Sequence, residues 1–332
     1  MVIASSRARR IVVAVVASLV GLALLVWQIR RVGLTTIEAG LAQVGAAFLA
    51  ILALAFLRFV LRALAWTTLI GDDVSVGAAL AATVSGDALG NVTPFSLFVS
   101  EPAKALYLRS NIPASRALAA LAAENFFYSL SVAVFIILGT IAMLAKFAVP
   151  ESVRTAGALS LALMVSVLAG ALWMVWREPA VVSSVLARVP LPRLTALVGR
   201  VRDFETRTYA FVRQSRGRLG VVGGCEVSFH LLSFAESYLT LRLITGLSLP
   251  VEAFVLDTVN RIINVMFRMV PFKVGVDEFG SELVSRAIGL APGAGTTLAL
   301  VRKGRLLVWA AAGLGLLLRR GFQTGSGQRA DR

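Results

Sequence analysis

The sequence predicts an all-α protein, a polytopic bundle of transmembrane helices with about six full spans, two re-entrant hairpins and an inverted internal repeat. The chain of 332 residues is 58% hydrophobic and 15% charged, and its mean hydropathy is +0.82. Soluble domains hold about 45–50% apolar and about 25% charged residues. Several apolar stretches are long enough to cross a bilayer, and one motif recurs in both halves. This composition excludes a lone soluble domain.

The apolar stretches give the expected spans in chain order. Each is long enough to cross the hydrocarbon core as a helix, with tilt where it is longer. The first follows Arg7, Arg9 and Arg10 and has no small-residue cleavage site, which favours an uncleaved span over a signal peptide. The six spans cover residues 11–29, 44–70, 117–145, 155–176, 219–245 and 296–318.

Two further segments, 74–111 and 251–290, are apolar but broken by proline and glycine. Proline removes a backbone donor and interrupts a helix. The freed backbone groups must then be buried in protein or line a wet cavity, because they cannot face lipid. We therefore predict that each segment is a re-entrant hairpin that returns to the side from which it entered. The predicted turn residues are Pro94, Phe95, Pro271, Phe272 and Gly275.

The distribution of arginine predicts the orientation. The longest polar stretch, 177–218, holds nine arginines against three acidic residues. Lys and Arg concentrate on the cytoplasmic side of membrane proteins, so we expect a multi-pass protein of the inner (cytoplasmic) membrane with both termini in the cytoplasm. Contact with anionic lipid accounts for the net charge of +15, and no nucleic-acid partner is expected. The loop fits either a helix lying on the membrane or a solvated connector; residues 321–332 are expected to be disordered.

The two hairpin segments share the pattern PFxxxVxE. It runs from Pro94 to Glu101 and again from Pro271 to Glu278, an offset of 177 residues at both ends. In the predicted topology the first unit, about 44–145, begins outside and the second, about 219–318, begins inside, so the units are inverted. Inverted repeats with broken helices place binding sites near the membrane midplane. We predict one transmembrane domain over residues 1–320.

Charged and amide side chains at membrane depth are the candidate site. One such cation costs about 2.5–3.5 kcal/mol on the insertion scale, so a group of them predicts a polar cavity. A phosphate headgroup suits such a cavity, whereas Arg58 and Arg62 fit either this cavity or snorkelling. Glu101 and Glu278 are expected to orient or neutralise the cations. The predicted substrate-binding residues are Asn91, Glu101, Lys104, Arg109, Arg261, Asn264, Arg268, Lys273, Glu278 and Arg302.

The sequence offers little for metal or covalent chemistry. With Cys225 as the one cysteine and His230 as the one histidine, we expect no internal disulfide, catalytic residue, metal site or cofactor. Glu226 and His230 are four residues apart on one span. They fit either a proton relay or a structural hydrogen bond between helices.

Around these motifs the sequence resembles the flippase-like family also called the lysylphosphatidylglycerol synthase transmembrane region. That family has a Pro-Gly-rich turn before a Gly-Glu and an arginine, and Glu101 and Lys104 take these last two positions. Its second motif, Pro-Gly-Gly-x-Gly-x-x-Glu, is similar to residues 271–278, which Gly289 and Arg302 follow. The chain departs from the family pattern at Ser96, Leu97, Phe98, Asn125, Phe272 and Lys273.

The resemblance, over about 12–318, implies translocation or handling of an anionic membrane lipid or a polyprenyl-phosphate-linked lipid. We expect the synthase half of bifunctional members to be absent, since no aminoacyl-transfer domain follows residue 320. We therefore predict an integral membrane lipid translocator without enzymatic activity. The alternatives are a membrane-embedded lipid-modifying enzyme and an assembly subunit of the cell envelope.

Overall fold

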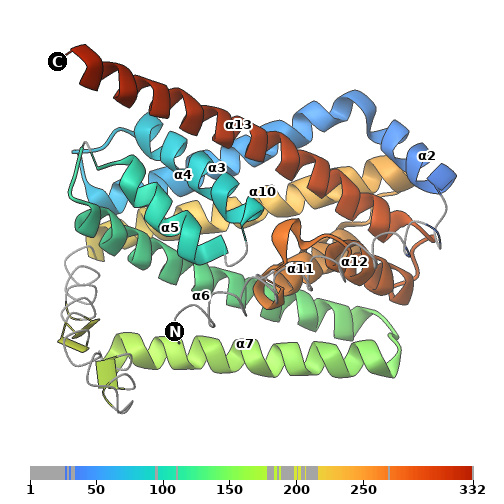
Figure 1. Cartoon of the computed structure of the whole chain (residues 1–332). Helices are drawn as coiled ribbons and strands as arrows, with labels where there is room; N and C mark the ends of the chain where they lie inside the picture. Colours follow the sequence, from blue (N-terminus) through green and yellow to red (C-terminus); the bar gives the residue numbers. More distant parts are fainter. Residues whose placement is uncertain are drawn as a thin grey trace, which may run out of the picture.

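The computed structural model describes residues 27, 30, 34–93, 96–109, 111–177, 183–184, 187, 198–199, 201–202, 206, 216–267 and 270–330. Over these ranges the chain is helical and contains no strand, as the all-α prediction requires (Figure 1). The helices in chain order are α2 (Leu34–Val44), α3 (Phe48–Ile70), α4 (Val76–Val92), α5 (Ser96–Tyr107), α6 (Ala114–Lys146), α7 (Glu151–Arg177), α10 (Arg216–Thr245), α11 (Pro250–Met266), α12 (Val276–Ala287) and α13 (Ala294–Ala330). Two 3-10 turns, η1 (Gly45–Ala47) and η3 (Pro271–Lys273), join them.

Within the described ranges, three helical segments are long and apolar enough to cross a membrane. They are Ile37–Ile70, Ala114–Lys146 and Glu151–Met174, and they coincide with three of the predicted spans. α7 packs on α6 (Figure 1). Large apolar side chains along α7 are exposed, among them Leu163 at 53%. The chain is therefore a multi-pass membrane protein.

Of the three remaining predicted spans, two are described as helices and one lies almost wholly outside the described residues. α10 and α13 cover the predicted spans 219–245 and 296–318, but their inner faces carry charged residues such as Glu236 and Arg302, so their crossing of the membrane stays a prediction. The predicted span 11–29, except Trp27, and most of the basic loop lie outside the described residues. α13 continues as helix to Ala330, over most of the segment predicted to be disordered. No proline interrupts that segment.

In each proline-broken segment the described residues form two helices, and in the second segment the turn η3 lies between them. α4 packs against α5, and α11 packs against α12. In the second turn Phe272 and Lys273 have φ values of 52° and 50°, and Gly275 follows at 81°. A left-handed backbone is costly for a bulky side chain and persists where the surrounding contacts enforce it. Pro94 and Phe95, the predicted first turn, lie outside the described residues.

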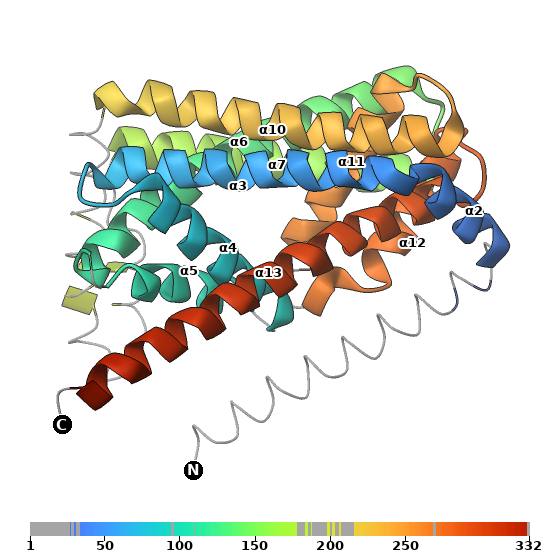
Figure 2. The same cartoon turned by 90° about the horizontal axis from the view of Figure 1, so that it is seen from above.

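The long helices α3 and α10 lie side by side and run in opposite directions (Figure 2). Where α3 ends and α10 begins, the Arg218 guanidinium donates to the Thr68 carbonyl over 3.2 Å. Where α3 begins and α10 ends, Ile51 packs in one cluster with Leu239. The hairpin α4–α5 lies beside the first of these ends and α11–α12 beside the second (Figure 2). α4 contacts η3, so the hairpins meet between the two ends.

Two glycines allow close helix crossings that hold the hairpins. A Cβ atom on Gly139 of α6 would lie 1.8 Å from Thr258 Oγ1 of α11. On Gly313 of α13 it would lie 2.4 Å from the Val84 carbonyl oxygen of α4. Small residues permit such approaches between membrane helices. The first helix of each hairpin is thus packed against the last long helix of the other half.

This packing predicts a difference between two glycines of α13. Gly313→Ala is expected to lower the thermal unfolding midpoint in detergent micelles, because the methyl group meets backbone that cannot move aside; overpacking costs about 1–3 kcal/mol. Gly315 has open space at its Cβ position, so Gly315→Ala is the matched control and should leave the midpoint unchanged or raise it slightly. Equal midpoints for the two variants would contradict the crossing.

Candidate functional site

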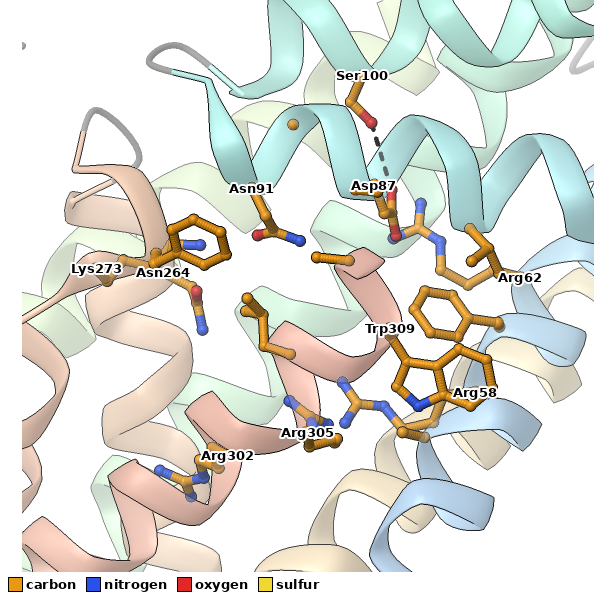
Figure 3. Close-up of a pocket in the computed structure, with 18 of the residues that line it drawn as sticks. Arg58, Arg62, Asp87, Asn91, Ser100, Asn264, Lys273, Arg302, Arg305 and Trp309 are labelled. Carbon is orange, nitrogen blue, oxygen red and sulfur yellow. Dashed lines mark hydrogen bonds between the residues drawn. The ribbon is translucent and has the colours of Figure 1, made fainter. Parts of the chain in front are cut away.

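A cavity of about 380 Å³ lies where the two hairpins meet (Figure 3). Both halves contribute to it: α3, α4, α5 and α6 from the first, and α10, α11, η3, α12 and α13 from the second. Among the described residues, its cationic lining consists of Arg58, Arg62, Lys104, Lys273, Arg302, Lys303 and Arg305. Its acidic lining consists of Asp87, Glu101 and Asp277. The lining is therefore predominantly basic.

Helical spacing places these side chains on inward faces. Arg58 and Arg62 are four residues apart on α3, and Arg302 and Arg305 are three apart on α13, so each pair shares one face of its helix. In Figure 3 the two α13 arginines lie on one side of the cavity, and Asn91 of α4 lies on the other. The cations of one wall thus face amide and acidic groups on the opposite wall.

A single buried carboxylate joins three helices beneath the cavity. Glu236 of α10 accepts hydrogen bonds on Oε2 from Arg58 Nη1 of α3, at 2.9 Å, and from Arg305 Nη1 of α13, at 2.6 Å. Both arginines are mostly buried. Because one carboxylate serves two guanidiniums, this cluster keeps an excess of one positive charge. Charge-assisted bonds of this kind offset the cost of removing the groups from water.

The α4–α5 corner has the opposite balance. Lys104, only 3% exposed, lies with Nζ 2.7 Å from Asp87 Oδ1 and 3.0 Å from Glu101 Oε1. Nearby, Arg62 donates to Glu124 Oε2 over 2.8 Å. One lysine thus faces two carboxylates, so this corner carries an excess of one negative charge. The cavity is therefore polarised between a positive α13 wall and a negative α4–α5 wall.

The second motif glutamate fixes its turn to α13. Glu278 accepts the Gly275 backbone N–H on Oε2 over 2.8 Å, which caps the start of α12, and accepts Lys303 Nζ on Oε1 over 2.5 Å. Arg302, 6% exposed, donates through Nη2 to Ser237 Oγ and to the Leu256 carbonyl. Both α13 cations are therefore positioned by groups behind the cavity wall.

Three donors around the cavity are buried without an acceptor among the described residues. They are Arg58 Nε, Arg302 Nη1 and Trp309 Nε1. A buried donor left unpaired costs about 1–3 kcal/mol, so such groups are rare unless water or a ligand completes them. Three donors with this deficit thus lie around one predominantly basic cavity.

The sequence-predicted site residues fall into three groups: those that line or adjoin the cavity, those outside the described residues, and those that lie elsewhere in the structure. Asn91, Glu101, Lys104, Asn264, Lys273 and Arg302 line the cavity together with the turn residue Phe272, and Glu278 lies directly behind it. Arg268, Pro94 and Phe95 lie outside the described residues, and only the backbone of Pro271 is described.

Arg109 and Arg261 do not line the cavity. Arg109 follows the end of α5 and is exposed there. Arg261 pairs with Asp257 over 3.2 Å and its guanidinium lies 4.2 Å from the centre of the Phe135 ring. Both are cationic residues in the predicted hairpins, but Arg109 lies beyond the end of α5 and Arg261 is held by Asp257 and Phe135 away from the cavity.

The predicted set omitted the lining residues Asp87, Lys303 and Arg305, and the structure places Arg58 and Arg62, which the sequence left open between the cavity and snorkelling, in the lining. Arg305 could have been found from the sequence, because it is three residues from Arg302 and therefore lies on the same face of the helix. Nothing local in the sequence pointed to Asp277 or Trp309 as lining residues.

Glu226 and His230 do not bond each other directly. The Ser131 hydroxyl of α6 lies 2.8 Å from His230 Nε2 and donates to Glu226 Oε2 over 3.2 Å. The three side chains form a hydrogen-bonded link between α6 and α10, and none of them lines the cavity. Within the described part of the chain, no group of three or more His, Cys, Asp or Glu side chains could hold a metal ion.

Comparison with known proteins identifies the chain at the level of a family. The family described as Lysylphosphatidylglycerol synthase TM region matches residues 11–315. This range includes both hairpins and all the cavity residues. No curated protein and no solved structure matches the chain.

The three-helix cluster predicts a large effect of one neutral substitution. Glu236→Gln leaves two buried guanidiniums without their counter-charge, and breaking a buried pair costs about 3–5 kcal/mol. The thermal midpoint in micelles should fall sharply. The control is Lys146→Gln at the Lys146–Glu252 pair, whose lysine is 50% exposed and where about 0–1 kcal/mol is expected. If both variants melt together, the cluster does not stabilise the bundle.

Proposed function

Since the chain belongs to the family of the lysylphosphatidylglycerol synthase transmembrane region, we propose that it translocates an anionic lipid across the membrane, with the phosphate headgroup in the basic cavity. The observation that carries this proposal is the set of buried, unpartnered donors Arg58 Nε, Arg302 Nη1 and Trp309 Nε1 around one cavity. Phosphate oxygens are strong acceptors, and they pair with guanidinium groups through charge-assisted bonds.

The size and charge of the cavity support a lipid headgroup as the ligand. Its volume, about 380 Å³, lies in the range of about 300–1,000 Å³ that is usual for small-molecule sites. The positive α13 wall attracts the phosphate, and the carboxylates of Asp87 and Glu101 opposite keep the site from holding it too tightly. A translocator needs this balance because its cargo must leave as well as enter.

The helix arrangement supports an inverted repeat of six spans with two re-entrant hairpins. α4 and α11 have equal lengths, and their bounds are offset by 174 residues (76 to 250 and 92 to 266). The close crossings repeat this offset, from Gly139 to Gly313 and from Val84 to Thr258. The antiparallel run of α3 and α10 is the relation that inverted units require. Such repeats permit alternating access to a shared midplane site.

The positions of basic residues support a cytoplasmic C-terminal end of α13 in the inner membrane. Arg116 donates to the Ile70 carbonyl and Arg218 to the Thr68 carbonyl, so both lie at the end of the bundle where α10 begins. α7 ends and α13 finishes at this same end (Figure 2). By the positive-inside rule this end faces the cytoplasm.

The main test is lipid flipping in proteoliposomes. Arg305→Gln removes one cavity cation while Arg58 still pairs with Glu236, and it should slow the flipping of fluorescent phosphatidylglycerol by about tenfold, the equivalent of about 1.4 kcal/mol. Dithionite quenching measures the rate. Arg286→Gln is the control, since Arg286 pairs with Glu282 on α12 outside the cavity. Equal rates for both variants, or no flipping by the unaltered protein, would reject the proposal.

The motif glutamates provide a second test. Glu101→Gln and Glu278→Gln remove the negative charge beside Lys104 and Lys303, so a bound phosphate should be held more tightly and flipping should be lost while expression persists. The control is Glu252→Gln, which removes a carboxylate outside the cavity whose partner, Lys146, is 50% exposed. Unchanged flipping in both motif variants would show that these carboxylates have no role in release.

A further inference from the structure

One wall of the cavity is apolar and lies along the seam between α3 and α13. Ala55 and Phe59 of α3 face Leu306, Trp309 and Ala310 of α13 on the inner side of this seam. The cationic part of the α13 wall, at 302–305, precedes this apolar part directly along the helix. The cavity is therefore amphipathic, with its charged part and its apolar part contiguous.

A single layer of aromatic rings separates the apolar wall from the exterior. The Trp309 ring stacks on Phe56 at 5.7 Å between centroids and meets Phe59 edge-on at 5.5 Å. Phe59 lines the cavity, whereas Phe56 is 39% exposed on the outer surface. On α13, Leu307 and Val308, which directly precede Trp309, are also exposed. The indole of Trp309 thus reaches from the cavity to the lipid-facing surface.

The indole N–H has no acceptor among the described residues, although the nitrogen is buried. Buried tryptophan normally donates this hydrogen bond. Two other donors of cavity-lining residues have the same deficit, Arg58 Nε and Arg302 Nη1, and both are cationic. A ligand that satisfies all three must carry acceptor oxygens beside an apolar portion.

We propose that the α3–α13 seam is the portal through which the acyl chains of the bound lipid extend from the cavity into the bilayer. Trp309 donates its N–H to an oxygen of the lipid, and Phe56 and Phe59 line the chain path. The inference rests on the proposed headgroup site and adds the route of the tails. A lipid whose headgroup occupies the basic part must place its chains somewhere apolar, and this wall adjoins that part.

The test uses the full chain in vesicles of phosphatidylethanolamine and phosphatidylglycerol. Two photoactivatable probes carry a diazirine midway along one acyl chain, one with a phosphatidylglycerol headgroup and one with phosphatidylcholine. After irradiation, mass spectrometry maps the labelled peptides. Leu163 on the outer face of α7 is the internal reference for ordinary lipid contact.

Relative to Leu163, the anionic probe should label the seam around Phe56, Phe59 and Trp309 about tenfold more than the zwitterionic probe, the equivalent of about 1.4 kcal/mol. Trp309→Phe keeps an aromatic ring but removes the N–H, and should reduce this excess by about two- to tenfold. Equal labelling by both probes would overturn the portal, and it does so on the unaltered chain even if the variant fails to fold.

Flipping measured on the same vesicles separates this inference from the proposed function. Flipping without preferential seam labelling keeps a translocator and rejects the portal. Preferential labelling without flipping keeps a lipid site with its chains at the seam and rejects translocation.

Discussion

The cost of burying charge in an apolar bundle is the constraint on which the rest of the structure depends. Each cation buried inside the bundle needs a counter-charge or an acceptor, because neither lipid nor apolar side chains can solvate it. Glu236 meets this requirement for Arg58 and Arg305 together and so ties α3, α10 and α13. Glu278 does the same for Lys303 and fixes a hairpin turn to α13. The ion pairs that make the cavity possible therefore also determine which helices lie next to it.

Close helix packing between the two halves holds the hairpins in place, in addition to the ion pairs. Gly139 and Gly313 let the last long helix of each half approach the first hairpin helix of the other half. The hairpins are consequently held by the opposite half, and their turns meet at the centre, where α4 contacts η3. The left-handed backbone at Phe272 and Lys273 brings both side chains to the cavity lining. Strain in the turn and polarity in the cavity thus occur at the same place, as is usual for functional sites.

Local sequence patterns predicted the features that depend on local physics. Apolar length located the helices, proline located the turn that begins at Pro271, and the repeated motif singled out Glu101 and Glu278. Which cations share one cavity depends on where helices distant in sequence cross, so the prediction included Arg261, which Asp257 neutralises elsewhere, and omitted Arg305. Trp309 was missed because an aromatic residue on an apolar helix resembles any lipid-facing one; only its contacts with Phe56 and Phe59 distinguish it.

The polarity of the cavity and the position of its aromatic seam are two parts of one arrangement. A phosphate between the α13 cations and the α4–α5 carboxylates is attracted from one side and repelled from the other. This balance would allow the phosphate to be released after binding. Hydrocarbon chains are not stabilised in that polar space, and at the proposed portal they are favoured beside Leu306 and Trp309, which form the apolar part of the lining. An amphiphile therefore has one orientation that satisfies both regions, with its charged end inward and its chains across the seam. In the proposed lipid site, the same two regions would disfavour a soluble anion, which lacks the apolar part, and a neutral lipid, which leaves the buried donors unpaired.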